Sequence, residues 1–130
     1  MTQGFLRVYV TRSSNKTPIE GARILVRDRT GMNLHTYYTN TYGTVPTMQL
    51  SAPDPAKSLD PNYLGQPFST FDMEVHMFGY NPIYIYNIQI FSGQTSIQPI
   101  SMNEKQPDAI ARGDLHVEHI FISDHPLVTR

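Results

Sequence analysis

Hydrophobic and polar residues alternate with a period of two along most of the chain, and clusters of Gly, Pro, Asn and Asp interrupt the alternation about every eight to twelve residues. Alternation of this kind is typical of strands with one buried face, and turns at this spacing are typical of a sandwich or barrel. We find no helical periodicity and no internal repeat. The sequence therefore predicts an all-β sandwich with strands at residues 5–10, 22–27, 34–39, 45–50, 71–77, 83–91 and 96–102.

The faces of these strands predict the hydrophobic core. Segment 71–77 has the clearest pattern, because its odd-numbered residues are apolar while Asp72, Glu74 and His76 are polar and are expected to face water. The same reasoning, applied to the other strands, gives a predicted core of Leu6, Val8, Val10, Ile24, Val26, Phe71, Met73, Val75, Ile88, Ile90 and Ile97.

Segment 83–91 has apolar residues on both faces. Strict alternation would place Ile83 and Ile85 on one face and put on the other face Tyr84, Tyr86, Ile88 and Ile90. Two apolar faces indicate either a central strand or a bulge, which we place near Asn87.

Three further segments set the predicted domain organisation. Residues 51–68 contain four prolines and no alternation, which predicts a long surface loop. Residues 103–113 are polar and irregular like a linker, whereas residues 115–122 alternate again and predict an extra strand. We therefore divide the chain into a sandwich of about seven strands at 1–102 and a linker with a C-terminal strand extension at 103–130.

Composition excludes several classes of function. The net charge is −1, charged residues make up 16% of the chain, and no basic stripe of the kind that binds nucleic acid is present. No apolar run approaches the ~20 residues of a membrane span. The N-terminus lacks the pattern of a secretory signal, so we expect synthesis in the cytoplasm and leave the final location open, including deposition on a spore or in an extracellular assembly. The absence of cysteine excludes disulfides and thiolate chemistry.

Several short motifs resemble a known family of sandwiches. They lie at residues 8–10 (VYV), 18–24 (PIEGARI), 39–43 (TNTYG) and 79–80 (GY). The order of these features resembles the transthyretin-like, carboxypeptidase-regulatory-like β-sandwich, whose strands follow a Greek key. Segments 50–53 (LSAP), 87–93 (NIQIFSG) and 96–100 (SIQPI) resemble the version found in spore cortex-lytic proteins of spore-forming bacteria. The likeness ends near Met102, and it implies peptidoglycan as one partner.

The candidate chemical groups do not form a catalytic or metal-binding set. His116 and His119 are three residues apart, so on a strand they point to opposite faces and cannot easily share one ion. His35 and His76 lie on separate strands and are expected to face solvent. The chain has neither a phosphate-binding glycine loop nor a serine nucleophile elbow, and it lacks the C-terminal Tyr-Arg-Gly-Ser tail of the hydroxyisourate hydrolases. We expect no enzymatic activity, no cofactor and no metal.

The tyrosines indicate more about the surface than the histidines do, since tyrosine side chains supply large contact areas at low entropic cost and are enriched at interfaces. The C-terminal segment adds apolar residues that need a partner. The predicted interaction surface consists of Tyr37, Tyr38, Tyr42, Tyr84, Tyr86, Leu115, Val117, His119 and Phe121. The alternative for any single tyrosine is a structural role in covering the core.

The extra strand at 115–122 must pair with the edge of a sheet, because an unpaired edge with an apolar face aggregates. A linker of about eleven residues reaches up to roughly 35 Å and allows pairing within the chain or with a neighbour's edge. The low charge and the tyrosines favour the neighbour. We therefore predict a structural or interaction module that forms a homo-oligomer or binds a protein partner, in a spore, cell-envelope or fibre setting. The alternatives are a subunit or decoration protein of a virus-like or phage particle, and a carbohydrate- or peptidoglycan-binding domain.

Overall fold

The structure is a computed structural model that describes residues 2–53, 68–105, 117–121 and 127–129, and within them it contains strands and no helix. The strands are β1 (Thr2–Arg12), β2 (Arg23–Arg27), β3 (Asn33–Tyr38), β4 (Met48–Ala52), β5 (Ser69–His76), β6 (Ile83–Ile90), β7 (Thr95–Met102), β8 (Glu118–Phe121) and β9 (Leu127–Thr129). The seven strands predicted up to residue 102 are all present, which confirms the all-β class.

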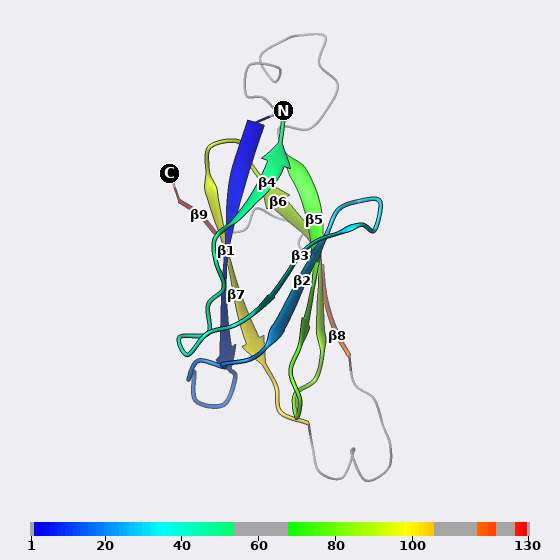
Figure 1. The fold of residues 1–130 in the computed structure, drawn as a ribbon. Helices are drawn as coiled ribbons and strands as arrows, with labels where there is room; N and C mark the ends of the chain where they lie inside the picture. The colour runs from blue at the N-terminus through cyan, green and yellow to red at the C-terminus, as the bar shows by residue number, and fades with distance from the viewer. Residues whose placement is uncertain (1, 54–67, 106–116, 122–126, 130) are drawn as a thin grey trace.

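Two sheets pack face to face (Figure 1). One has the strand order β4-β1-β7-β9 and the other β3-β2-β5-β6-β8. The chain crosses from β1 to the second sheet and comes back in β4, which lies beside β1 as the last strand of a Greek key lies beside the first. Two pairs are parallel, β1 with β7 and β6 with β8. The predicted β-sandwich is confirmed.

The core between the sheets contains ten of the eleven residues predicted for it. The exception is Ile97, which is half-buried, while the neighbouring Ser96 is fully buried. Register explains the difference: Ser96 pairs with Leu6 of β1 and so shares its inward face. The Ser96 hydroxyl donates a hydrogen bond to the carbonyl oxygen of Gln89 at 2.9 Å, which satisfies it inside the core.

A bulge in β6 corrects the predicted faces of that strand. The pairing steps from Phe71 opposite Ile88 to Met73 opposite Ile85, so β6 has one more residue than β5 across this step. Asn87 lies in the step with a φ of 67°. The extra residue reverses the alternation, so the inward face carries four buried isoleucines: Ile83, Ile85, Ile88 and Ile90. The bulge near Asn87 and the burial of Ile88 and Ile90 were predicted, but the burial of Ile83 and Ile85 on the same face was not.

The C-terminal segment supplies an edge strand to each sheet. β8 pairs with β6 of the same chain, whereas the sequence favoured pairing with a neighbour, so that expectation is corrected. β9 pairs with β7, although the sequence predicted only a tail there. The predicted strand residues 115, 116 and 122 lie outside the described part of the chain.

The predicted bounds of β4 also shift. Pro46 has no N–H to donate to a ladder, and the strand begins after it at Met48. Ser51 and Ala52 were predicted as loop but pair with Gln3 and Thr2 of β1. The remainder of the predicted loop, residues 54–67, lies outside the described residues.

Candidate functional site

An aromatic face lies on the outer side of the five-stranded sheet, where β6 and β8 run side by side. We define it by Tyr84 and Tyr86 of β6 and by His119 and Phe121 of β8. The parallel register places Tyr84 opposite His119 and Tyr86 opposite Phe121. Because paired residues project from the same face of a sheet, the four rings form one surface.

The rings are stacked on one another. Tyr86 packs on Phe121 with ring centroids 4.6 Å apart, and His119 lies nearly parallel to both tyrosines at 5.5 Å from Tyr84 and 5.9 Å from Tyr86. The Tyr86 hydroxyl also lies 3.0 Å from Nδ1 of His119, within hydrogen-bond distance. Phe121 nevertheless remains 69% exposed, so the face is open to a partner.

A charged cluster borders the aromatic face on the same side of the sheet. Glu74 of β5 forms an ion pair with Arg27 of β2, and its other oxygen lies 3.2 Å from Nε2 of His76. Loss of water contact raises the pKa of the Tyr84 hydroxyl above its usual value, and the charge of Glu74 with a hydrogen bond to it adds to the rise. Tyr84 therefore stays neutral and able to donate a hydrogen bond.

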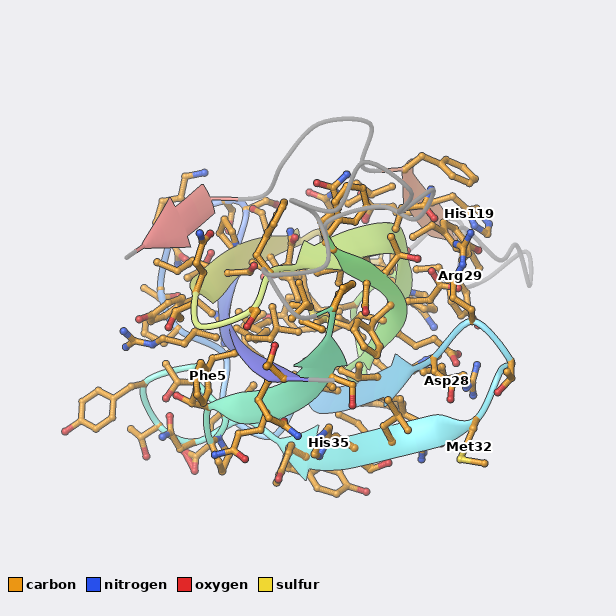
Figure 2. All side chains as sticks on the ribbon, turned by 90° about the horizontal axis from the view of Figure 1, so that it is seen from above. Phe5, Asp28, Arg29, Met32, His35 and His119 are labelled. Carbon is orange, nitrogen blue, oxygen red and sulfur yellow. The ribbon has the colours of Figure 1, made fainter. Side chains whose placement is uncertain are left out.

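A hollow of about 310 Å³ lies between this cluster and the turn after β2. Arg29 reaches across from that turn and donates a hydrogen bond to the side-chain oxygen of Asn87 at 2.9 Å. Figure 2 shows Arg29 and His119 on the same side of the molecule, with Phe5 on the opposite side. The hollow is lined by Arg27, Asp28, Arg29, Gly31, Asp72, Met73, Glu74, Tyr84 and Tyr86.

Of the other residues predicted for the interaction surface, Tyr37, Tyr38 and Tyr42 do not join this face. Tyr37 packs against the core and stacks on His35 at 5.7 Å. Tyr38 lies on β3, at the opposite edge of the same sheet from β8. Tyr42 is 78% exposed in the turn after β3. Val117 is half-buried just before β8, and Leu115 lies outside the described residues.

The histidines on β3 and β5 differ in their surroundings. His35 was expected to face solvent but pairs with the inward-facing Val26, and its Nε2 lies 3.3 Å from the carbonyl oxygen of Gln49. His76 faces outward as predicted. Sequence reasoning named Glu74 and His76 only as solvated residues, because it could not tell that β2 would bring Arg27 beside them.

A second hollow, of about 570 Å³, lies at the end of the five-stranded sheet beside Phe78, which is 99% exposed. Sequence reasoning missed Phe78, although a phenylalanine just before the turn at Gly79 and Tyr80 was a usable signal. The residues that line this second hollow are Gly21, Arg23, Tyr38, His76, Met77, Phe78, Tyr80, Pro82 and Lys105.

Within the described residues, no group of three or more His, Cys, Asp or Glu side chains is placed to hold a metal ion. The same part of the chain has no helix of the length and apolarity that crossing a bilayer requires.

Comparisons with known proteins give a shared fold. No family model matches the chain, and no curated protein does. Among solved structures, the Bacillus anthracis TIE protein aligns over 79% of this chain with 12% identity and a TM-score of 0.58. A candidate carbohydrate-binding protein from Bacteroides uniformis aligns over 75% with 12% identity and a TM-score of 0.49.

An intradiol ring-cleavage dioxygenase from Tetranychus urticae aligns over 69% of the chain with 16% identity and a TM-score of 0.41. The chain spans 18%, 40% and 49% of the lengths of these three proteins, in the order given. The TIE protein alone of the three has a TM-score above 0.5, and at 12% identity that likeness concerns the fold. What the chain shares with the TIE protein is thus an all-β sandwich fold.

Proposed function

We propose that the chain is a non-catalytic binding module that holds a protein partner on the aromatic face. The observation that carries this proposal is the row of stacked rings from β6 and β8, with Phe121 left largely in water. Rigid aromatic side chains that already pack on one another lose little entropy on binding, and such residues dominate the affinity of protein interfaces. A cell envelope, spore or fibre is the setting that the resemblance in sequence suggests.

The charged cluster beside the face supports a structural role better than a catalytic one. Arg27 forms an ion pair with the Glu74 carboxylate, and Nε2 of His76 lies within hydrogen-bond distance of its other oxygen. A general base needs a carboxylate or imidazole that is free to take a proton from a substrate. Here the groups satisfy one another, so we propose that they fix the orientation of Tyr84 at the border of the face.

The proposed partner site can be tested by cross-linking from the aromatic face and by substitution of its rings. A photo-reactive phenylalanine analogue at Phe121, expressed in the producing cells, should form an adduct with the partner, which mass spectrometry identifies. The purified partner should then bind the double variant Tyr86→Ala/Phe121→Ala about 10- to 100-fold more weakly than the wild-type chain.

Tyr42→Ala is the matched control, because it removes an exposed tyrosine outside the face. Its affinity should equal that of the wild type. Equal binding by the double variant, or the same adduct with the analogue at Tyr42, would overturn the proposal.

A glycan is the second candidate, and the hollow beside the face favours it. Aromatic rings stack on the C–H face of a sugar, and the Arg29 guanidinium and the Asp72 carboxylate, which line the hollow, suit its hydroxyls. Peptidoglycan is the glycan suggested by the resemblance to cortex-lytic proteins. Isolated peptidoglycan should then sediment the wild-type chain but not Tyr84→Ala, and equal sedimentation of both would reject this candidate.

A further inference from the structure

The outer edge of β3 is an open strand edge. β3 ends the five-stranded sheet, and within the described residues no strand pairs with its second side. Natural sheets usually protect such edges with charged residues, proline, a β-bulge or a very short strand. β3 is six residues long, NLHTYY, and has a bulge only at its first residues and neither charge nor proline, whereas β8 at the opposite edge contains Glu118.

The backbone groups that this edge presents follow from its pairing with β2. Thr39, just after β3, donates to the carbonyl oxygen of Ala22 and accepts from the N–H of Gly21, so both its backbone groups point toward β2. Backbone direction alternates along a strand. Residues 35 and 37 therefore also point toward β2, and the N–H and C=O groups of Thr36 and Tyr38 point away from the sheet. A bulge between Val26 and Arg27 leaves Leu34 without an opposite residue on β2, so the alternation ends at His35.

β3 is also held in place on its other sides. His35, labelled in Figure 2, has its Nε2 3.3 Å from the carbonyl oxygen of Gln49 on β4 of the other sheet. Asp28 closes the turn that leads into the strand, since its carboxylate accepts hydrogen bonds from the N–H groups of Thr30 and Met32 at 2.9 and 3.0 Å. A fixed edge loses little entropy when another strand joins it.

We propose that this edge pairs with β3 of a second copy of the chain, antiparallel and about a two-fold axis. The register centred on Thr36 sets Thr36 opposite Thr36 of the second copy and brings Tyr38 of each copy beside Leu34 of the other. The two β3 strands then form a symmetric antiparallel pair, in which each contact occurs twice, as a two-fold interface requires. The five-stranded sheets of the two copies join into one sheet of ten strands (5 + 5).

The side chains suit this register. Leu34 and Tyr38 are 38% and 66% exposed, and each covers the other across the new pair. Aromatic–aliphatic and Thr–Thr pairs are favourable cross-strand neighbours, and no like charges meet because β3 has none. One strand pair buries less than a standard interface, so we expect a dissociation constant on the order of micromolar or weaker. This surface is separate from the aromatic face, and either proposal stands without the other.

The experiment measures the mass of the full chain by sedimentation velocity over a range of concentrations. The wild type should shift from 14.8 kDa toward twice that mass as concentration rises. Thr36→Lys and Thr36→Glu should each stay monomeric, because like charges meet across the axis. An equimolar mixture of the two variants should associate again, since Lys then lies opposite Glu.

Ser101→Lys is the control, since it adds the same charge at an exposed position of the inner strand β7 and should leave the association unchanged. Amide hydrogen exchange supplies a second readout: the N–H groups of Thr36 and Tyr38 should gain protection as the wild type is concentrated. The proposal is wrong if the wild type stays monomeric at all concentrations, if Thr36→Lys still associates, or if the mixture of charged variants stays monomeric.

Discussion

Asn87 connects the core and the aromatic face through its backbone. Its positive φ inserts the extra residue that turns Ile88 and Ile90 inward while Tyr84 and Tyr86 stay outward. Asparagine adopts this conformation more readily than most residues with a side chain. Its N–H donates to Asp72 at 3.1 Å and its side-chain oxygen accepts from Arg29, so neighbouring strand and turn both hold the bulge.

The effect of a substitution at Asn87 on the free energy of unfolding should therefore depend on whether the new residue adopts a positive φ without strain. Asn87→Val places a β-branched residue at a φ of 67° and should lower the free energy of unfolding by about 1–3 kcal/mol. Asn87→Gly adopts the same φ without strain and should cost less, even though it loses the same contact with Arg29. Urea denaturation of both variants measures the difference, and equal losses would mean that the side-chain contact, not the backbone, matters here.

The strands themselves were largely predictable, because alternation depends only on which face is buried. The faces of β1, β2 and β5 follow directly from their sequences, and Val75 is fully buried as expected. The register between two paired strands cannot be read from one of them alone, and it accounts for two wrong predictions. Ser96 is buried in place of Ile97 because it pairs with Leu6 of β1, and His35 faces inward because it pairs with Val26 of β2.

The site was predicted in part for the same reason. Tyrosines on β6 and aromatic residues on β8 could be named as surface candidates, but a single sequence does not say which strands become neighbours. The parallel pairing of β6 with β8 brought four of the nine predicted residues together and left Tyr42 elsewhere. Arg27 and Glu74 joined the border of the face through the pairing of β2 with β5.

The role of the last two strands can be tested by truncation. Deleting residues 113–130 removes β8 and β9, yet among the described residues the buried hydrophobic core ends at Met102. The shortened chain should remain folded by circular dichroism, with a melting temperature lower by about 5–10 °C because two strand pairs are lost.

The same truncated chain separates two modes of self-association. If copies join through β3, it still associates, whereas joining through the C-terminal strand would leave it monomeric. A truncated chain that does not fold would show that the segment beyond residue 102 is integral to the sandwich and not an extension of it.

At the scale of the molecule, the two sheets share one core and should unfold together. The inner face of each sheet is covered by the other, so neither has a core of its own. Denaturation followed by tyrosine fluorescence and by far-ultraviolet circular dichroism should give coincident two-state transitions. The chain has eight tyrosines and no tryptophan, which makes the first probe specific to tyrosine surroundings. Separate midpoints would mean that one sheet, or the β8 edge, unfolds independently.

The central place of β1 in its sheet has a consequence for synthesis. Phe5 pairs with Thr95, which is added 90 residues later (95 − 5), so the pairing of β1 cannot be completed until β7 exists. At about 5–20 residues per second, a ribosome needs roughly 5–18 s to reach that partner. Throughout that interval β1 lacks its parallel neighbour β7, and its apolar residues Leu6, Val8 and Val10 lie in an incomplete sheet. A nascent chain of this fold therefore exposes an apolar segment that chaperones can bind, and β1 is paired on both sides only after β7 has been made.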